Sequence, residues 1–481
     1  MTPTTIPAAL LALALLPHIA LAQTAEQRST LADQREVAVT IYNENLALVK
    51  DQRRVQLKPG ASALAFRDVS ARMRPETALL RSVSAPGSLS VLEQNFDFDL
   101  LTPRKLLEKY VGQTVSVVRT NPATGAETTE QATVLAANDG VVLQIGQRVE
   151  TGIPGRLVFG SVPANLRDRP TLVMSLENTA ASAQEVELSY LTAGLAWKAD
   201  YVVELNATDD KLDISGWVTL TNTSGASYRN ARLQLVAGDV NQAPPELAPR
   251  GRAVMMAAST MAKSSNDMAE ESLFEYHLYT LARPTTIAEN QTKQVALLSA
   301  TGVPVRKELL LKGNDYYYQG QAGDLGQKLK VGVFVEFDNK ESARLGMPLP
   351  KGVIRVYKKD AAGNAQFIGE DRVDHTPKGE KVRLKLGDAF DVTADKKQTD
   401  FKKLSGTGKY NAVYESAYEI VLKNAKKDAV IVTVQEPMPG DWQMVSASQP
   451  HTKGAANTAV WAVPVPAEGK AVLTYRTQVR F

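Results

Sequence analysis

The sequence contains no cysteine among its 481 residues. Without a thiol, the protein cannot form disulfide bonds, thiolate metal sites, a cysteine nucleophile or a lipid-anchor cysteine. Histidine is scarce as well, with four residues in the whole chain. Because the motifs G-x-S-x-G, S-x-x-K, H-E-x-x-H and the P-loop are also missing, we expect no cofactor and no catalytic set with a local signature. A Ser–His dyad assembled from distant positions stays open.

An excess of charge of either sign is missing too. Lys and Arg number 55 against 52 Asp and Glu, and no basic block stands out, so we expect no nucleic-acid partner. The 44% hydrophobic and 22% charged residues are typical of a folded globular protein. A chain of 481 residues exceeds one ordinary core, so several modules are expected.

Long hydrophobic runs are absent apart from one at the amino terminus. Ile6 to Ala22 is apolar and ends in Ala20-Leu21-Ala22, which fits a signal-peptidase site, although no Lys or Arg precedes the run. We predict a signal peptide at 1–22, cleaved after Ala22, and an exported periplasmic or cell-surface protein. An uncleaved anchor is the alternative, but the run is short and is broken by Pro17. No later stretch reaches the ~18 apolar residues of a transmembrane helix.

Strand-like segments make up most of what is present, and one pattern recurs among them. A strand ends in asparagine, a polar turn follows, and a second strand begins; this occurs at Asn178, Asn222 and Asn424. Asparagine suits such turns because its side chain bonds nearby backbone and tolerates left-handed conformations. The recurrence has no fixed period, so it favours immunoglobulin-like β-sandwich modules over a solenoid.

One short helix and a small barrel are expected in the amino-terminal half. Thr102 can cap a helix that has Pro103 in its first turn. The strand candidates after it, with Asn138-Asp139-Gly140 as a tight hairpin turn, are similar to SH3 or Sm barrels. Sm barrels can bind RNA, but mixed Arg and Glu without a basic-aromatic surface favour a structural role here. The predicted fold class is mainly β, with immunoglobulin-like β-sandwich modules, a small SH3/Sm-like barrel and one short helix.

The predicted boundaries follow from these patterns. Prolines and four of the ten methionines gather in residues 242–271, and the lack of a helical period there favours a mobile insertion. Two tryptophans, Trp197 and Trp217, are expected to anchor sandwich cores. The predicted divisions are a signal peptide at 1–22, an N-terminal β domain at 36–100, a barrel-like insertion at 101–165, a β-sandwich at 166–310 and a C-terminal β-sandwich at 311–481.

The strongest metal candidate is a group of three residues, Asp371, Asp374 and His375, in one predicted turn. Two carboxylates and an imidazole so close together could hold a divalent cation. A polar loop whose carboxylates bond backbone amides is the commoner outcome for such a sequence. We favour the loop and keep the three residues as candidate metal ligands.

Two further groups have both a functional and an ordinary interpretation. Glu275 and His277 are two residues apart in a predicted strand and would face the same side as base and orienting group, or as an exposed pair. Tyr316-Tyr317-Tyr318 could form a stacking platform for glycans or a partner. Core and edge packing is the interpretation favoured for the tyrosines, because neighbours in a strand alternate faces.

Several stretches carry a family resemblance. They include GLAWKADY at 194–201, GWVTLTNTSGASYRNARLQLVAGDVN at 216–241 and LPKGVIRVYKKD at 349–360. Together they resemble the bacterial domain of unknown function numbered 4139, and the amino-terminal VTIYNENLALVKDQRRV is similar to what precedes that domain in exported members. The resemblance implies an exported β-rich protein and brings no catalytic residue. Some relatives are labelled mucoidy inhibitors, which implies a role in the cell envelope.

Three hypotheses of function follow. The leading one is a non-enzymatic binding or assembly module with a protein or envelope-polymer partner, of open oligomeric state. The second is a metal-dependent or hydrolytic enzyme that acts on envelope or extracellular polymers and is centred near His375. The third is an outer-membrane barrel protein, because Leu473 to Phe481 alternates and ends in phenylalanine. A final sandwich strand explains the same alternation and is favoured.

Overall fold

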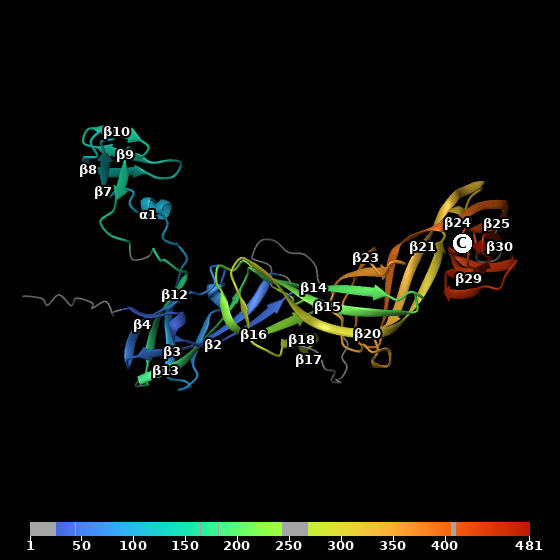
Figure 1. Ribbon diagram of the computed structural model, residues 1–481, viewed down its shortest axis with the longest axis horizontal. Coiled ribbons are helices and arrows are strands. Elements are labelled where there is room, and N and C mark those ends of the chain that lie inside the picture. Colours follow the sequence, from blue (N-terminus) through green and yellow to red (C-terminus); the bar gives the residue numbers. More distant parts are fainter. Residues whose placement is uncertain (1–25, 44, 164–165, 181, 243–267, 406–409) are drawn as a thin grey trace, which may run out of the picture. The chain divides into compact units, whose positions relative to one another are not determined.

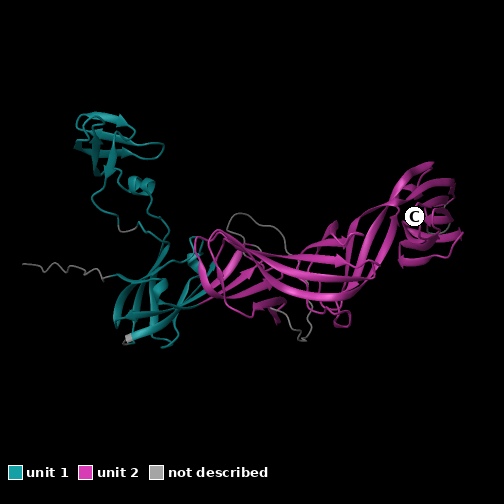
Figure 2. Ribbon diagram, in the orientation of Figure 1, with its two compact units in different colours: residues 1–36, 50–191 teal, residues 37–49, 192–481 magenta. Residues whose placement is uncertain are grey.

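The computed structural model describes residues 26–43, 45–163, 166–180, 182–242, 268–405 and 410–481. Its elements are strands almost throughout, so the mainly β prediction is confirmed (Figure 1). The predicted signal peptide and most of the predicted insertion at 242–271 lie outside the described residues. Contacts divide the chain into two compact units, residues 1–36 with 50–191 and residues 37–49 with 192–481 (Figure 2). The finer predicted boundaries stay predictions.

Three strands contribute residues to both units: β2 (Gln34–Tyr42), β3 (Leu46–Leu57) and β13 (Ser182–Thr192), of which only Thr192 belongs to the second unit. The rest of the first unit is built on a four-stranded sheet with the order β1-β4-β12-β6, and β5 pairs with β13. Inside this unit the fully buried Arg53 pairs with Asp51 at 2.8 Å. Its elements are β1 (Glu26–Ser29), η1 (Leu31–Asp33), β4 (Gly60–Arg67), η2 (Pro75–Thr77), β5 (Leu79–Ser82), β6 (Leu89–Asp97), β12 (Thr171–Asn178) and β13 (Ser182–Thr192).

The first unit also contains the predicted helix and a small sheet with its own core. Helix α1 (Pro103–Lys109) begins where predicted, since the Thr102 side chain accepts a hydrogen bond from the backbone N–H of Lys105. Five strands follow in the order β10-β9-β8-β7-β11, and the sheet does not close. The predicted barrel is therefore an open sheet, because no ladder joins β10 to β11 in the part of the unit that the structure describes. The strands are β7 (Thr114–Thr120), β8 (Glu127–Ala136), β9 (Val142–Ile145), β10 (Arg148–Thr151) and β11 (Arg156–Val158).

The second unit contains a thirteen-stranded sheet system in which two strands are unusually long. Strand β20 (Gln291–Lys312) pairs with β15 along its first half and with β21 and β26 along its second. Strand β24 (Lys381–Leu404) pairs with β21 up to Lys397, and its second half, from Val392, pairs with β25. The remaining strands of this system are β14 (Leu195–Leu205), β15 (Lys211–Asn222), β21 (Asp324–Asp338), β22 (Gly352–Lys359), β23 (Ala365–Val373), β25 (Val413–Asn424), β26 (Val430–Pro437), β27 (Asp441–Ala447), β28 (Thr452–Ala455), β29 (Thr458–Val465) and β30 (Gly469–Arg480).

Beside this system, β16 (Tyr228–Ala237) pairs with β2, with β18 and with the short β19 (Thr285–Ile287). The hairpin of β17 (Met268–Leu273) and β18 (Tyr276–Leu281) corrects one prediction. The expected single strand through Leu273 and Tyr279 is interrupted by a turn at Phe274, whose φ is +58°. Strand β17 begins at Met268, so residues 268–271 at the end of the predicted insertion form part of a strand.

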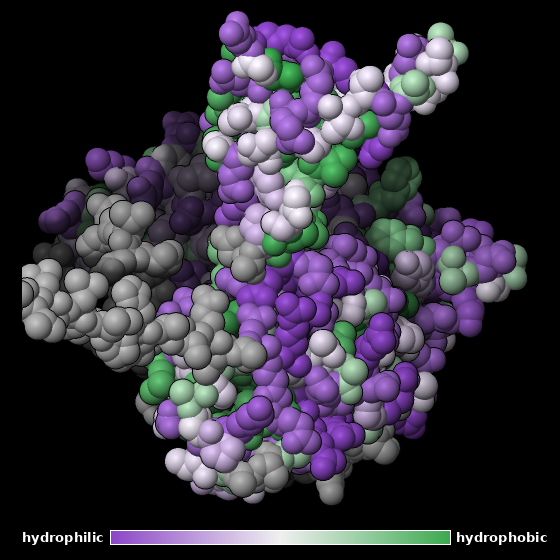
Figure 3. All heavy atoms as spheres, turned by 90° about the vertical axis from the view of Figure 1, so that its left-hand side faces the viewer, coloured by the Kyte–Doolittle hydropathy of each residue, from purple (hydrophilic) through white to green (hydrophobic). Residues whose placement is uncertain are grey.

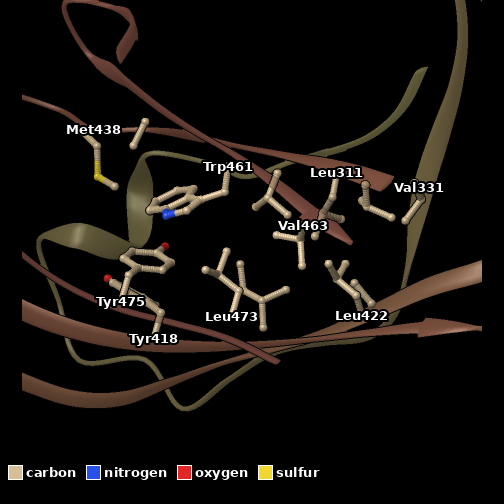
Figure 4. Packing of buried hydrophobic residues seen from close by; sticks show 14 of the residues in the cluster. Leu311, Val331, Tyr418, Leu422, Met438, Trp461, Val463, Leu473 and Tyr475 are labelled. Carbon is tan, nitrogen blue, oxygen red and sulfur yellow. The ribbon is translucent and has the colours of Figure 1, made fainter. Parts of the chain in front are cut away.

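The carboxy-terminal part of the second unit is a β-sandwich, as predicted. One layer contains β24, β25, β30 and β27, and the other contains the end of β20 with β26, β29 and β28. The inward residues of both layers form one core (Figure 4). Alternation in β30 buries Leu473, Tyr475 and Val479, so the final strand is a sandwich strand. Two short 3-10 helices, η3 (Tyr316–Tyr318) and η4 (Glu341–Ala343), complete the unit.

The predicted asparagine joints are confirmed, and the structure adds a fourth. Three strands end in an asparagine with a buried side chain: Asn178, Asn222 and Asn424. The fourth, Asn339, is also buried and is the first residue after β21. Each side chain accepts a hydrogen bond from a nearby backbone N–H and donates to carbonyl groups of neighbouring turns. The donors are Ala180, Ser224, Gly346 and Lys426, and the acceptors include Leu57, Ala226, Met347 and Pro466.

Of the two expected core tryptophans, one is confirmed. Trp197 on β14 is buried, with 5% of its surface exposed. Trp217 on β15 is 40% exposed, so the prediction is wrong for this residue. The two side chains lie on opposite faces of neighbouring strands because Trp197 pairs with Leu220, three residues from Trp217.

Candidate functional site

The three candidate metal ligands lie at the end of β23 and just after it. Both carboxylate oxygens of Asp371 accept backbone hydrogen bonds, from Arg372 at 2.8 Å and from Lys385 at 2.7 Å. Asp374 is exposed. Over the ranges that the structure describes, no group of three or more His, Asp or Glu residues is arranged to hold a metal ion. The geometry therefore matches the polar-loop interpretation, and the metal site stays a prediction without support.

The surroundings of His375 hold its ring in place. Its Nδ1 accepts from the backbone N–H of Lys351 at 3.3 Å, and its Nε2 lies 3.4 Å from the side-chain nitrogen of Asn43. Burial and the Lys351 cation lower the pKa of His375, against the opposing effect of Asp239 and Asp374. The imidazole is thus kept neutral, which suits a structural acceptor.

The second predicted pair is not formed. Glu275 lies in the turn of the β17–β18 hairpin and is exposed. His277 Nδ1 instead lies 2.7 Å from Glu270 Oε1 on the neighbouring strand. The single-strand prediction placed Glu275 and His277 on one face. Glu275 instead lies in the turn with Phe274, and the strand that contains His277 begins only at Tyr276.

The three consecutive tyrosines form η3 rather than part of a strand. Tyr316 is 69% exposed, whereas Tyr317 and Tyr318 are buried in the core of the C-terminal sandwich. They contact an ion pair between Lys396 and Glu436 that sequence reasoning missed. The sequence does contain an indication of this ion pair. Lys396 follows Val392 and Ala394 at two-residue spacing in β24, so it lies on the same inward face as these buried residues.

Large apolar side chains are exposed in both units of the chain. On the face shown in Figure 3, hydrophilic residues predominate and apolar ones are interspersed among them. One aromatic residue has a larger exposed fraction than the other described ones. Phe390 is 96% exposed, the highest value for a large apolar side chain in the described part of the chain.

The local backbone explains why Phe390 points outward. It lies in a bulge of β24, because two steps along β21 (330 to 332) correspond to five steps along β24 (388 to 393). Extra residues in a bulge leave the ladder and redirect their side chains. Gly387, with φ of +140°, precedes the bulge in a conformation that other residues rarely adopt.

Beside Phe390 is an open hollow of about 580 Å³ at one end of the sandwich. The bulge of β24, the end of β25 and the start of β30 supply its walls. Its charged residues balance: Lys423 and Lys470 carry positive charge, and Asp391 and Glu468 carry negative charge. An almost bare aromatic side chain with a mixed polar rim has the composition of a protein-binding surface. We call Phe390 and these four residues the Phe390 surface.

The family described as "Domain of unknown function (DUF4139)" matches residues 186–481, which is more than half of the chain. The chain belongs to this family. The match confirms the resemblance expected from the sequence and includes the Phe390 surface and the Lys396–Glu436 pair. The similarity noted at residues 39–55 lies outside the matched range. The family's description gives no activity, so the biochemical role of this DUF4139 protein is unknown.

No curated protein matches the chain. Along the described ranges, none of the helices has the length and apolar character required to cross a bilayer. The geometry of this DUF4139 protein is therefore the basis for choosing its candidate functional residues. By that standard the Phe390 surface is the strongest candidate for contact with a partner.

Proposed function

We propose that this DUF4139 protein is an exported, envelope-associated module that binds a partner protein through the Phe390 surface and is not an enzyme. The single observation that carries the proposal is the 96% exposure of Phe390 on a bulge. Burying a phenylalanine side chain stabilises a complex by roughly 1.5–3 kcal/mol relative to leaving it in water. A folded chain that keeps such a group exposed gains that energy when a partner covers it.

The charges around Phe390 favour a protein over a charged polymer as the partner. Two cations and two anions line the hollow, so its net charge is zero. A polyanion would be attracted by an excess of cations, whereas protein interfaces have an apolar centre and a mixed polar rim. The partner that fits is a folded protein with an apolar pocket for one aromatic ring.

The exported location is part of the same proposal and depends on the amino-terminal leader. The apolar run ending in Ala20-Leu21-Ala22 supports it. The test is the amino terminus of the protein recovered from the producing cell. Export with cleavage predicts a chain that begins at Gln23, and a full-length chain recovered from the cytoplasm contradicts it.

The binding proposal is tested by cross-linking in cells followed by recovery of the tagged protein under denaturing conditions. Wild type is expected to trap one defined protein, and Phe390→Ala is expected to trap at least tenfold less. Tyr316→Ala is the matched control, since Tyr316 is also an exposed aromatic residue of the second unit. Recovery of a solitary monomer that turns over envelope or extracellular polymers would reject the proposal in favour of an enzyme.

A further inference from the structure

An ion pair crosses the core of the C-terminal sandwich. Lys396 on β24 and Glu436 on β26 come from opposite layers, and Lys396 Nζ lies 2.6 Å from Glu436 Oε2. The exposed fractions of the two side chains are 3% and 0%. Two reactive groups of complementary chemistry are thus held together away from water.

Tyrosine side chains enclose the pair. The Tyr317 hydroxyl donates to Glu436 Oε2 and accepts from Lys396 Nζ, and the Tyr318 hydroxyl donates to the same oxygen at 3.2 Å. Nζ lies 4.1 Å from the centre of the Tyr317 ring. Burial raises the pKa of Tyr317 and of Tyr318 above the ordinary value, so both hydroxyls keep their protons. The rings of Tyr418 and Tyr475 complete the enclosure.

The charged form of this pair is costly. Removing an ammonium and a carboxylate from water costs several kcal/mol per ion, and mutual attraction offsets this only partly. Transfer of one proton from Lys396 to Glu436 removes both charges and leaves an amine beside a carboxylic acid. Burial lowers the pKa of Lys396 and thereby favours the neutral amine, although the attraction of Glu436 acts in the opposite direction.

We propose that Lys396 and Glu436 condense into an intramolecular amide that links the two layers of the sandwich. The Nζ lone pair attacks the carboxyl carbon, so a C–N bond forms and the C–Oε2 bond breaks. Oε2 leaves as water with the carboxyl proton and one amine proton, while Oε1 becomes the amide oxygen. No oxidant, reductant or other reactant is required.

The contacts assign a role to each neighbouring group. The Tyr317 hydroxyl contacts both Nζ and Oε2, so it can carry the amine proton to the departing oxygen and is the catalytic residue. Glu436 Oε1 has no hydrogen-bond partner among the described residues, which leaves it free to become the carbonyl. Gly313 makes room for this arrangement, because a Cβ there would lie 2.2 Å from Oε2.

The amide would do for this chain what a disulfide does in other exported proteins. The chain has no cysteine, so no disulfide can join its strands. A covalent link between positions 396 and 436 restricts the unfolded chain and thereby stabilises the folded one. This inference stands independently of the binding proposal, since the pair is buried and Phe390 is exposed.

Peptide mapping of the denatured, purified wild-type protein by mass spectrometry tests the amide. We expect one branched peptide that contains Lys396 and Glu436 and is lighter than the two separate peptides by one water molecule. Trypsin should not cleave after Lys396. Recovery of both separate peptides, with cleavage after Lys396 and no branched peptide, overturns the proposal. The masses of these peptides do not depend on whether the amino-terminal leader is cleaved.

Two variants serve as controls. Lys396→Arg cannot form the amide, and the paired change Lys396→Met with Glu436→Leu replaces the ion pair by apolar side chains of similar size. Tyr317→Phe is expected to be linked at least tenfold less than wild type shortly after synthesis, with circular dichroism to confirm that it is folded. Linkage at the wild-type rate in folded Tyr317→Phe would overturn the role of Tyr317.

Discussion

At the scale of single residues, buried asparagines fix the ends of four strands. Each satisfies backbone groups of two neighbouring turns that would otherwise lie unpaired away from water. An unpaired buried polar group costs about 1–3 kcal/mol. The same side chain that permits the turn therefore also anchors it to the next one.

Substitution of one of these asparagines should be destabilising. Asn222→Ala removes the donor that reaches three carbonyl groups, so we expect a loss of about 2–3 kcal/mol in the free energy of unfolding. Urea denaturation measures it. The control is the exposed Asn138→Ala, which should stay within about 0.5 kcal/mol of wild type. Equal losses of unfolding free energy in the two variants would show that the buried Asn222 contributes no more to stability than an exposed asparagine.

His375 gives a prediction for the dependence of stability on pH. Its pKa is lowered in the folded protein, so the unfolded chain binds the proton more tightly. The stability that depends on neutral His375 is therefore complete above the unfolded pKa of about 6.5 and is lost as the pH falls below it. Urea denaturation at about pH 7.5 and about pH 5.5 should show a larger loss in wild type than in His375→Gln. Equal losses in both proteins would contradict this account.

At the scale of elements, the bulge of β24 directs Phe390, the centre of the proposed binding surface, away from the core. Because Phe390 is 96% exposed, Phe390→Ala removes no buried contact. We expect its unfolding midpoint to change by less than the equivalent of about 0.5 kcal/mol, while partner capture falls. Thermal denaturation followed by circular dichroism measures the stability. A large loss of stability would assign Phe390 a structural role instead.

The small sheet of β7 to β11 gives a second prediction at this scale. It has its own core, and the chain leaves and returns at one place, since the backbone N–H of Leu101 donates to the carbonyl of Arg167 at 2.7 Å. We expect removal of residues 102–163, with two glycines in their place, to leave the remaining strands folded. Far-ultraviolet circular dichroism and urea denaturation measure this. A chain that no longer unfolds cooperatively would show that the sheet supports the remainder.

At the scale of the whole molecule, the sequence was informative wherever burial alternates. The strands, the helix after Thr102 and the final sandwich strand follow directly from that alternation and from local capping. The length of β20 was not predictable, because Gly302 and Pro304 lie within it and resemble a turn. The lysine in the core of the C-terminal sandwich was missed because a lysine is normally exposed and only its distant partner Glu436 explains its burial. Phe390 was missed because a bulge depends on the register of two strands far apart in sequence.

The central claim is that the Phe390 surface holds a partner protein. A photoreactive amino acid placed at position 390 in cells tests it most directly, with the same substitution at the exposed Phe274 as control. The account predicts one discrete cross-linked product from position 390 on illumination, and little or none from position 274. A protein that stays uncross-linked at position 390, or gives the same products from both positions, would contradict the claim.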